Sequence, residues 1–265
     1  GKIKKMLQSG ENKDKIKEEI MSYLYSTENV AEQIFNYFNE QHHFSEIPDD
    51  KTILIEHYKG EKHYTIFHTL YGRRVNDVLS RAIAYLVASY KERDIEIGIS
   101  DNGFFLAGEK LNIERALNEL TPDKLEKILK EAIEKSEVLK RRFRHCATRS
   151  LMILRNYKGN TKTVGRQQVN SEFLYRAVKK ISSEFPILQE ARREVLEDLM
   201  DINNAKIILE MIHSNKIKIK NVTTLLPSPF SLSLMIQGYA DLIKIEDRAA
   251  FLKRMHQLHM KSIKS

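Results

Sequence analysis

Residues 52–72 have the sequence TILIEHYKGEKHYTIFHTLYG, in which the hydrophobic pattern takes the two-residue period of a β-strand. Residues 52–58 are rich in β-branched side chains and alternate between apolar and polar, and residues 63–70 alternate again. Between them, Lys59-Gly60-Glu61 has the composition of a turn, and Gly72 ends the second run. The stretch therefore predicts two antiparallel strands joined in a hairpin.

The pattern on the carboxyl side of this hairpin predicts a helix, a second hairpin and an edge strand. Residues 73–90 place their apolar side chains on one face of a long helix. Residues 95–99 alternate again, and Asp101-Asn102-Gly103 is a strong turn signal before residues 104–107. Residues 217–222 alternate apolar side chains with lysines, which protect an exposed sheet edge from pairing with other chains.

Most of the remaining chain has the hydrophobic period of amphipathic helices. Residues 1–46 are expected to form a helical lead-in that packs on an α+β domain over residues 47–265, so that the two make one compact unit. One helix is expected over 137–156, and a basic helix over 246–262 is expected to close the chain. The predicted fold class is α+β, mainly helical, with a small antiparallel sheet built from the two hairpins plus the edge strand.

The composition is that of a soluble, folded protein with an excess of positive charge. Hydrophobic residues make up 42% and charged residues 30% of the 265 residues, and no apolar run is long enough to span a membrane. The single cysteine, Cys146, excludes an internal disulfide and fits a reducing, cytoplasmic location. Lys and Arg number 44 against 36 Asp and Glu, and the net charge of +8 favours a polyanionic partner, although solubility alone also explains it.

The sequence contains none of the short motifs that carry phosphate-binding or hydrolytic chemistry. It has no GxxxxGK[ST], GxGxxG, GxSxG or HExxH, and the lysines of residues 158–163 lack the spacing that wraps a phosphate. His57, His63 and His68 cluster at the first hairpin, but the last two have opposite strand parity and face opposite sides of the sheet. We therefore expect no catalytic residue, no metal site and no cofactor in this chain.

Two basic clusters are the best candidates for a binding site. Arg73 and Arg74 follow Gly72 at the start of a predicted helix. The backbone amides at that helix start and the two guanidinium groups together favour the binding of an anion. Further along, Lys140-Arg141-Arg142-Phe143-Arg144-His145 is a basic run in which Arg142 and His145, with Arg149, share one face of a helix whose other face is apolar. The alternative is a solvated face with local ion pairs. The basic cluster continues with further candidate phosphate ligands at Arg155, Lys158 and Arg166.

Three residues with aromatic rings are of interest: one stands beside the basic cluster, and two lie in the first hairpin. Tyr157 stands next to Lys158, and His63 and Tyr64 begin the second strand of the hairpin. Such rings can stack on the bases of a single-stranded nucleic acid, because every base offers a π face. They can equally be ordinary core or edge residues, and the sequence leaves both interpretations open.

Four stretches, in their order and spacing, carry a resemblance to a known family. The first stretch is HTLYGRRVND at 68–77 and the second is SDNGF at 100–104. The third is FRHCATR at 143–149 with RNYKG at 155–159 and RQQ at 166–168. The fourth is FP at 185–186 with LEDLMD at 196–201, PSPF at 227–230 and QGY at 237–239. Together they resemble the C-terminal, DEAD/H-associated domain of Lhr-type (large helicase-related) superfamily 2 helicases, over about residues 12–255. The short C-terminus after Lys261 is similar to the archaeal form.

The resemblance implies a parent protein that is an ATP-dependent helicase. Such a helicase translocates 3′ to 5′ on single-stranded DNA and unwinds DNA:DNA or RNA:DNA duplexes, with an expected role in DNA repair. Its ATP and Mg²⁺ would bind RecA-like domains outside this sequence. The expected partners are single-stranded or forked DNA, an RNA:DNA hybrid, and the winged-helix and RecA-like domains of the parent.

In this family the domain helps to close a channel over the tracking strand, and an aromatic residue, commonly Trp, begins the second strand of the hairpin. Here His63 and Tyr64 occupy that place. The first hypothesis is a nucleic-acid-binding accessory domain of a helicase. The second is a structural module that docks on the neighbouring domains without touching nucleic acid. A hydrolase using Asp101 or Asp201 is weaker, because both stand where turns and helix caps favour Asp.

Overall fold

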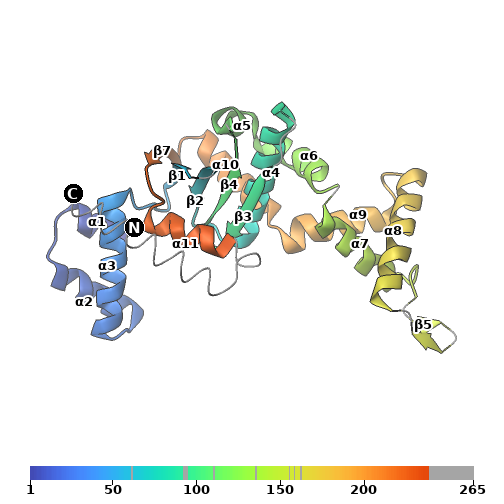
Figure 1. The fold of residues 1–265 in the computed structure, drawn as a ribbon, viewed down its shortest axis with the longest axis horizontal. Helices are drawn as coiled ribbons and strands as arrows, with labels where there is room; N and C mark the ends of the chain where they lie inside the picture. The colour runs from blue at the N-terminus through green and yellow to red at the C-terminus, as the bar shows by residue number, and fades with distance from the viewer. Residues whose placement is uncertain are drawn as a thin grey trace.

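The fold is elongated, with a group of N-terminal helices at one end, a β-sheet in the middle and a helical arm at the other end (Figure 1). It is seen in a computed structural model that describes residues 1–60, 62–91, 95–109, 111–134, 136–154, 156–157, 159–161 and 163–238. The basic helix expected over 246–262 lies outside these ranges.

Within the described residues, both predicted hairpins and the predicted edge strand join one sheet. Its order is β3-β4-β2-β1-β7, and the pairs within and between the hairpins are antiparallel. The strands are β1 (Thr52–Lys59), β2 (His63–His68), β3 (Glu96–Ser100), β4 (Gly103–Gly108) and β7 (Lys218–Thr224). The α+β fold class is therefore confirmed.

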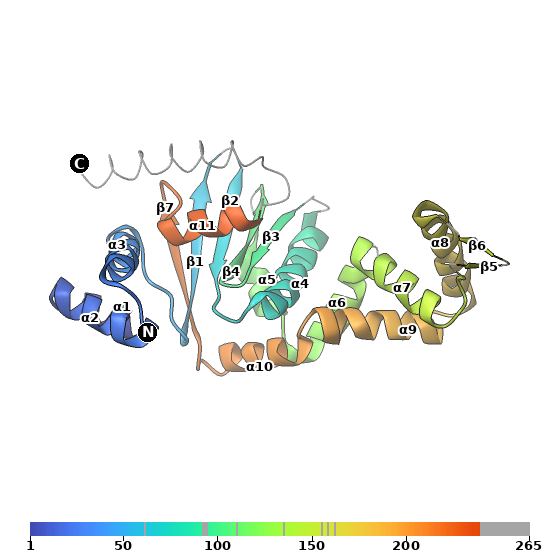
Figure 2. The same ribbon diagram turned by 90° about the horizontal axis from the view of Figure 1, so that it is seen from below.

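The prediction of a wholly antiparallel sheet is wrong at its edge, because β7 pairs with β1 in parallel. The preceding helix, α10 (Ile202–His213), runs below the end of the sheet at which β1 begins (Figure 2). It delivers the chain to that end, where the Lys218 amide donates to the Lys51 carbonyl at 2.9 Å. The direction of β7 thus follows from the path of the helix that precedes it, and the residues of β7 alone do not encode that direction.

Both faces of the sheet are covered, which explains why its central strands are apolar on both sides. Ile55 and Phe67 belong to the main core together with side chains of α4 (Arg73–Lys91). Ile66 and Phe105 point to the other face and meet α11 (Pro229–Gly238). The strict alternation along each strand therefore separates two layers of core.

The arm extends the main core away from the sheet through consecutive helices. First α5 (Ile113–Glu119) and α6 (Pro122–Ile133) pack on α4 beside the sheet, and then α7 (Glu137–Arg149), α8 (Val164–Ile181) and α9 (Pro186–Arg193) form the arm itself, with the short strands β5 (Asn156–Tyr157) and β6 (Asn160–Thr161) between α7 and α8. The last six residues of the helix that starts at Pro186 form a π-helix, η1 (Glu194–Leu199). Short π segments occur often at functional sites.

The helix expected over 137–156 is shorter than predicted, because α7 ends at Arg149. Leu151 has a φ of +58°, in the left-handed region that ends helices. The chain then turns back so that the Ile153 amide donates to the Ala147 carbonyl at 3.1 Å and the Ile153 side chain is buried. The helix thus gives way to a reversal that returns Ile153 to the main core.

The N-terminal helices α1 (Lys2–Gln8), α2 (Lys13–Leu24) and α3 (Glu28–Phe44) have an apolar cluster of their own, which includes Ile16, Ile20 and Phe35. Phe38 of α3 meets Phe230 of α11 edge to face, with ring centres 5.3 Å apart. The division of the chain at residue 46 stays a prediction. Among the described helices, none combines the length and the apolar character that crossing a bilayer requires.

Candidate nucleic-acid interface

Helix α7 distributes its side chains over three faces. Leu139 and Phe143 lie on a face that is fully buried in the arm. Arg142 and Arg149 turn toward η1, so the predicted basic face opposite the apolar one is present. A third face borders α8 and carries the further cations Lys140, Arg141 and Arg144. The helix is therefore basic on two sides.

The η1 side of α7 is organised by one buried acid, Glu194, which is only 3% exposed. Nη1 of Arg142 donates to Glu194 Oε2 at 3.3 Å, and Nη2 of Arg149 donates to Oε1 of the same carboxylate. The Arg149 side chain nevertheless remains 61% exposed. One carboxylate thus holds two guanidinium groups at the surface and neutralises only one of their charges.

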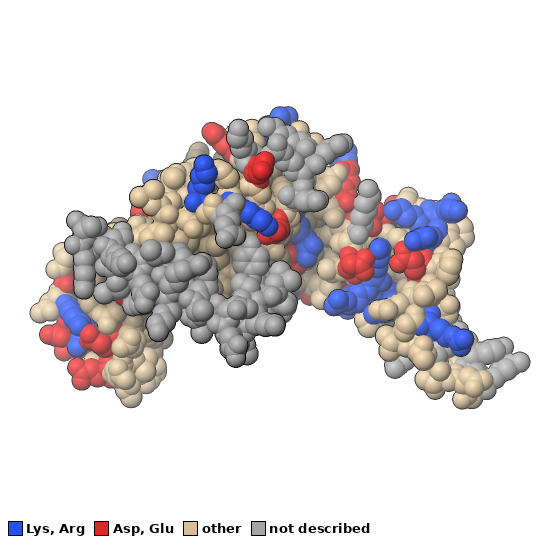
Figure 3. Space-filling view, viewed as in Figure 1, with Lys and Arg blue, Asp and Glu red and all other residues tan. Residues whose placement is uncertain are grey.

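A groove of about 460 Å³ opens between α7 and η1 above this ion pair. We call it the η1 groove, and it is lined by Val138, Arg141, Arg142, His145, Thr148, Arg149 and Leu199. Figure 3 shows that Lys and Arg side chains gather over the arm, with Asp and Glu between them. Three arginines and a histidine line the groove beside the apolar Val138 and Leu199, and their guanidinium groups suit an anionic ligand.

The exposed imidazole of His145 reports the electrostatic potential of the η1 groove. Partial burial lowers its pKa, and the positive charges of Arg144, Arg142 and Arg149 lower it further, against a smaller opposing effect of Glu194. A depressed histidine pKa beside arginines means that added positive charge is disfavoured there. Three arginines line the groove and one carboxylate, Glu194, lies beside them, so the groove has an excess of positive charge.

The first basic cluster, at the start of α4, is occupied by contacts within the chain. Nη2 of Arg74 donates to the carbonyls of Glu197 at 2.5 Å and Met200 at 3.1 Å, at the carboxyl end of η1. Nη1 of Arg73 donates to the Ile99 carbonyl at 2.9 Å. Both residues are exposed overall, and phosphate binding by them stays a prediction.

The rings of the first hairpin lie on the sheet, away from the arginines of α7 (Figure 1). Tyr64 is half-buried and stacks on Tyr58, with ring centres 5.9 Å apart, and it meets Phe105 edge to face. His63, the first residue of β2, is exposed. Of the two, His63 is the more accessible to a base, and stacking by either ring stays a prediction.

The remaining candidates lie near the tip of the arm. Arg166 is exposed in the first turn of α8, whose N-cap is Thr163. Tyr157 lies in β5, while Arg155 and Lys158 lie outside the described residues. The structure thus brings Arg142 and Arg149 together and links Arg74 to the same π-helix, but it does not gather all the candidates at one site.

A sequence model of the DEAD/H-associated family matches residues 47–231. The chain belongs to the DEAD/H-associated family. It is 48% identical over 260 residues to the ATP-dependent helicase Lhr-Core of Methanothermobacter thermautotrophicus, a match that covers 97% of this chain and 30% of that protein. With the Lhr-Core helicase of Saccharolobus solfataricus the identity is 41%, again over 30% of the relative. The DEAD/H-associated chain therefore spans about a third of the length of these relatives.

A solved structure has the same fold. The Mycobacterium smegmatis helicase Lhr bound to ssDNA and AMP-PNP superimposes with a TM-score of 0.76 and 25% identity, covering 84% of this chain and 29% of that one. The Lhr helicase/uracil glycosylase of Escherichia coli is 28% identical over 242 residues, 89% of this chain and 16% of its own. The resemblance to Lhr-type helicases seen in the sequence is confirmed.

Sequence reasoning missed the acid on which the DEAD/H-associated arm depends. Glu194 follows Ala191 by three residues and therefore continues the apolar stripe of α9, where an acid signals a buried ion pair. It placed Arg141 and Arg144 in the basic run of this helix but not among the candidate ligands, and both border α8 in the structure. Which face of α7 meets which neighbour depends on tertiary packing.

The described residues contain no group of three or more His, Cys, Asp or Glu side chains that could hold a metal ion. His68 is buried and lies 2.9 Å from Ser231 Oγ and 3.5 Å from the buried Glu56, both through Nε2. This polar cluster joins β1 and β2 to the start of α11. Asp201 accepts the Asn204 amide at 3.1 Å as the N-cap of α10, as its sequence position predicts.

Proposed function

We propose that this chain is the nucleic-acid-binding accessory domain of an ATP-dependent 3′–5′ DNA helicase and helps to form the channel for the single strand. Similarity to Lhr-Core helicases over almost the whole chain supports the helicase assignment. The solved Lhr helicase bound to ssDNA supports a nucleic-acid partner. The greater identity to the Methanothermobacter protein than to the Escherichia coli one supports an archaeal origin.

The observation that carries the proposal is the electropositive η1 groove. A guanidinium group offers a planar fork of donors that matches a phosphate, and Arg149 has most of its side chain exposed. Contacts to phosphates alone carry no sequence information, as a motor that moves along DNA requires. In this proposal, ATP and Mg²⁺ bind RecA-like domains elsewhere in the helicase. The substrates include forked DNA and RNA:DNA hybrids, and the helicase acts in DNA repair.

The proposal is tested by fluorescence anisotropy of the 265-residue chain with single-stranded, duplex and forked DNA over a salt series. For single strands, log K should fall against log salt with a slope of about −0.7 for each phosphate contacted. The variant R142Q/R149Q/E194Q removes both arginines without leaving the buried carboxylate unpaired. It should bind more weakly, with a slope shallower by about 1.4.

The matched control is K216Q/K218Q, which removes two exposed lysines at and beside the start of the edge strand β7, remote from the arm. Its affinity should change little, because those lysines lie away from the proposed path. An unchanged slope in R142Q/R149Q/E194Q would exclude the η1 groove. Absence of any binding at low salt would overturn nucleic-acid binding by this chain.

A docking module is the second candidate, and two observations favour it. The guanidinium groups of Arg142, Arg149 and Arg74 are already engaged within the chain. In addition, Tyr23 and Tyr25 at the end of α2 are 79% and 95% exposed. Large exposed apolar side chains mark protein contacts. In this case the chain would bind winged-helix and RecA-like domains added in trans, while showing no salt-dependent binding of DNA.

A further inference from the structure

We infer that a second groove, between α7 and α8, is a binding surface for single-stranded nucleic acid, with phosphates along α7 and bases toward α8. We call it the α7/α8 groove. The inference rests on the proposed function but concerns side chains that the η1 groove does not use, apart from Arg141.

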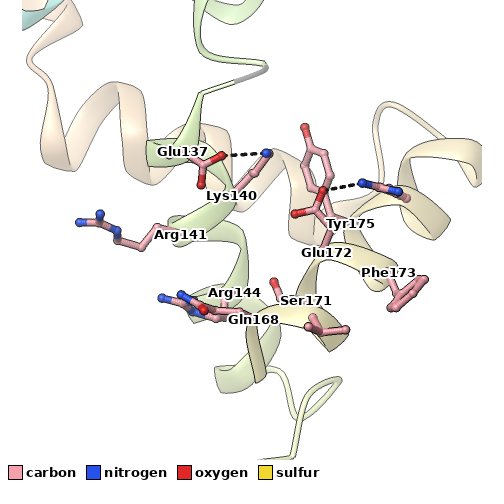
Figure 4. A pocket seen from close by; sticks show the side chains of 11 residues that line it. Glu137, Lys140, Arg141, Arg144, Gln168, Ser171, Glu172, Phe173 and Tyr175 are labelled. Carbon is pink, nitrogen blue, oxygen red and sulfur yellow. Dashed lines mark hydrogen bonds and ion pairs between the residues drawn. The ribbon is translucent and has the colours of Figure 1, made fainter. Parts of the chain in front are cut away.

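The α7/α8 groove has a volume of about 540 Å³. It is lined by Glu137, Lys140, Arg141, Arg144, Gln168, Val169, Ser171, Glu172, Phe173, Tyr175 and Arg176 (Figure 4). Four cations therefore face two carboxylates. The groove has a floor as well as walls, because Tyr175 is buried and packs edge to face on Phe143, with ring centres 5.2 Å apart.

The two carboxylates are each held by a neighbour on their own helix. Glu137 accepts from Lys140 at 2.8 Å, and Glu172 accepts from Arg176 at 3.0 Å (Figure 4). Arg141 and Arg144, in contrast, make no ion pair with a carboxylate of the described residues. Two guanidinium groups are thus left to meet an anion from outside, and their planar forks suit phosphate.

The α8 wall is different in character and points to a nucleic acid rather than an acidic protein. Phe173 is 69% exposed and Val169, one helical turn before it, is 55% exposed. Figure 4 shows Phe173 projecting from α8 on the side away from α7, so a base stacked on its ring would lie at the outer rim of the α7/α8 groove. An exposed aromatic ring beside a cationic track is the combination that binds single strands, since bases stack on the ring while phosphates meet the cations.

The two grooves adjoin, because Arg141 lines both of them. A single strand could therefore cross α7 from one groove to the other without leaving basic surface. The arginines of α7 then act as one track rather than as two separate sites. Phe173 also gives the arm an aromatic ring on which a base can stack. His63 and Tyr64 do not provide one there, because they lie in β2 of the sheet.

The test uses the 265-residue chain with R141Q/R144Q, F173A and the lysine control K216Q/K218Q. Because Arg141 and Arg144 hold no carboxylate in the described structure, their replacement should leave thermal unfolding unchanged. We expect the slope of log K for single-stranded DNA against log salt to become shallower by about 1.4 in R141Q/R144Q. The affinity of F173A for single-stranded DNA should be lower by roughly fivefold or more, as expected when the stacking of one base is lost.

A fluorescent variant supplies a second readout. The chain has no Trp, so F173W introduces a single reporter at the proposed stacking position. Oligothymidylate should quench the emission of F173W, and polyglutamate of equal charge should not. Equal quenching or equal affinity with polyglutamate would overturn the inference, because the groove would then be a general site for polyanions.

The inference and the proposed function fail in different ways. If R142Q/R149Q/E194Q weakens binding while R141Q/R144Q and F173A do not, the α7/α8 groove is excluded and the helicase accessory role stands. If F173A weakens binding together with R141Q/R144Q, the inference holds, because Phe173 lines the α7/α8 groove and not the η1 groove, whereas Arg141 lines both. If the unmodified chain binds no nucleic acid at low salt, both are excluded.

Discussion

Glu194 is the residue on which two of the candidate phosphate ligands depend, because its carboxylate bonds both Arg142 and Arg149. We expect E194Q to lower the free energy of unfolding by about 1–3 kcal/mol, since a buried, doubly bonded acceptor loses its charge while both arginines stay partly solvated. The affinity for single-stranded DNA should rise, because the carboxylate no longer competes with phosphate. Urea unfolding and anisotropy measure the two effects.

The control for this change is E190Q, one turn earlier. Glu190 bonds Arg193 at the surface, where ion pairs contribute little, so both stability and DNA affinity should stay near those of the unmodified chain. A fall in the DNA affinity of E194Q would contradict the expectation. It would mean that Glu194 positions the arginines for phosphate rather than competing with it.

His145 gives a pH-dependent readout of the same groove. Its pKa is lowered by partial burial and by the neighbouring Arg144, Arg142 and Arg149, so the free chain holds fewer protons there than an unfolded chain does near pH 6. Phosphates that neutralise the arginines should raise this pKa, so that binding takes up a proton. By linkage, the affinity for DNA should increase as the pH falls through the pKa of the complex.

Titration of the imidazole signal by NMR, with and without oligothymidylate, measures this shift. H145Q provides the control, since it removes the titrating group and should flatten the pH dependence of binding between about pH 5 and 7. For folding the sign is opposite: because the pKa of His145 is lower in the folded chain than in the unfolded one, its protonation disfavours the folded state as the pH falls. A pKa that stays unchanged on adding DNA would place the strand elsewhere.

Residue patterns in the sequence predicted part of this site. Arg142, His145 and Arg149 share a helical face by spacing alone, and the structure has them on one groove. Their partner could not be predicted, because Glu194 lies 45 residues beyond Arg149 and meets it only through the packing of α9 on α7. The ring of Tyr64 likewise has strand spacing in the sequence, but its neighbours Tyr58 and Phe105 emerge only from the register of three strands.

The element that joins the sheet to the arm is the π-helix η1, and Arg74 holds its carboxyl end. The guanidinium group donates to two carbonyls there, where the helix end is partially negative. We expect R74Q to lower the free energy of unfolding by about 1–2 kcal/mol. Hydrogen exchange should speed up in η1 and at the start of α10, because the link between α4 and the arm is loosened.

R73Q is the matched variant, since Arg73 is the neighbouring residue and makes a single bond to the Ile99 carbonyl. It should change stability by about 0.5 kcal/mol or less, as exposed substitutions usually do. A larger effect of R73Q than of R74Q would show that the sheet edge, and not η1, depends on this cluster. Equal loss of DNA affinity in both, with stability intact, would instead support the predicted anion site.

Elements with a strong hydrophobic period were predicted correctly. Features that depend on the packing of other elements were not. Both hairpins and α4 follow from alternation, turn residues and helical spacing in the sequence itself. The parallel direction of β7 depends on where α10 ends, and the early end of α7 depends on a pocket for Ile153. The hydrophobic pattern of the sequence continues through η1, so nothing in that pattern indicates a π-helix rather than an α-helix.

At the scale of the whole molecule, the elongated shape sets two surfaces far apart. Tyr23 and Tyr25 stand exposed at the end of α2, whereas the two basic grooves lie on the arm at the opposite end, beside exposed apolar side chains of the arm such as Val164 and Phe173 (Figure 1). The sheet and the shared core lie between them. Such an arrangement allows one end to contact protein and the other to contact nucleic acid at the same time, so docking on neighbouring domains does not by itself exclude nucleic-acid binding by the arm.

Hydrogen–deuterium exchange on the 265-residue chain with oligothymidylate distinguishes the ends. We expect protection in residues 137–149 and 164–176, which form the walls of the two grooves, because a bound strand would restrict the opening of these helices. Residues 13–44 and the edge strand β7 should exchange at unchanged rates. The same measurement with the lysine variant K216Q/K218Q should give the same protected segments.

Protection confined to residues 13–44 would contradict this placement, because it would locate the nucleic acid at the end with exposed tyrosines and leave the arginines of α7 without a ligand. Protection of α7 alone, with α8 unchanged, would keep the η1 groove and exclude the α7/α8 groove. Protection of both helices that weakens as salt is added is the result that a phosphate track across α7 requires, since salt competes for every phosphate on the track and would release the two helices together.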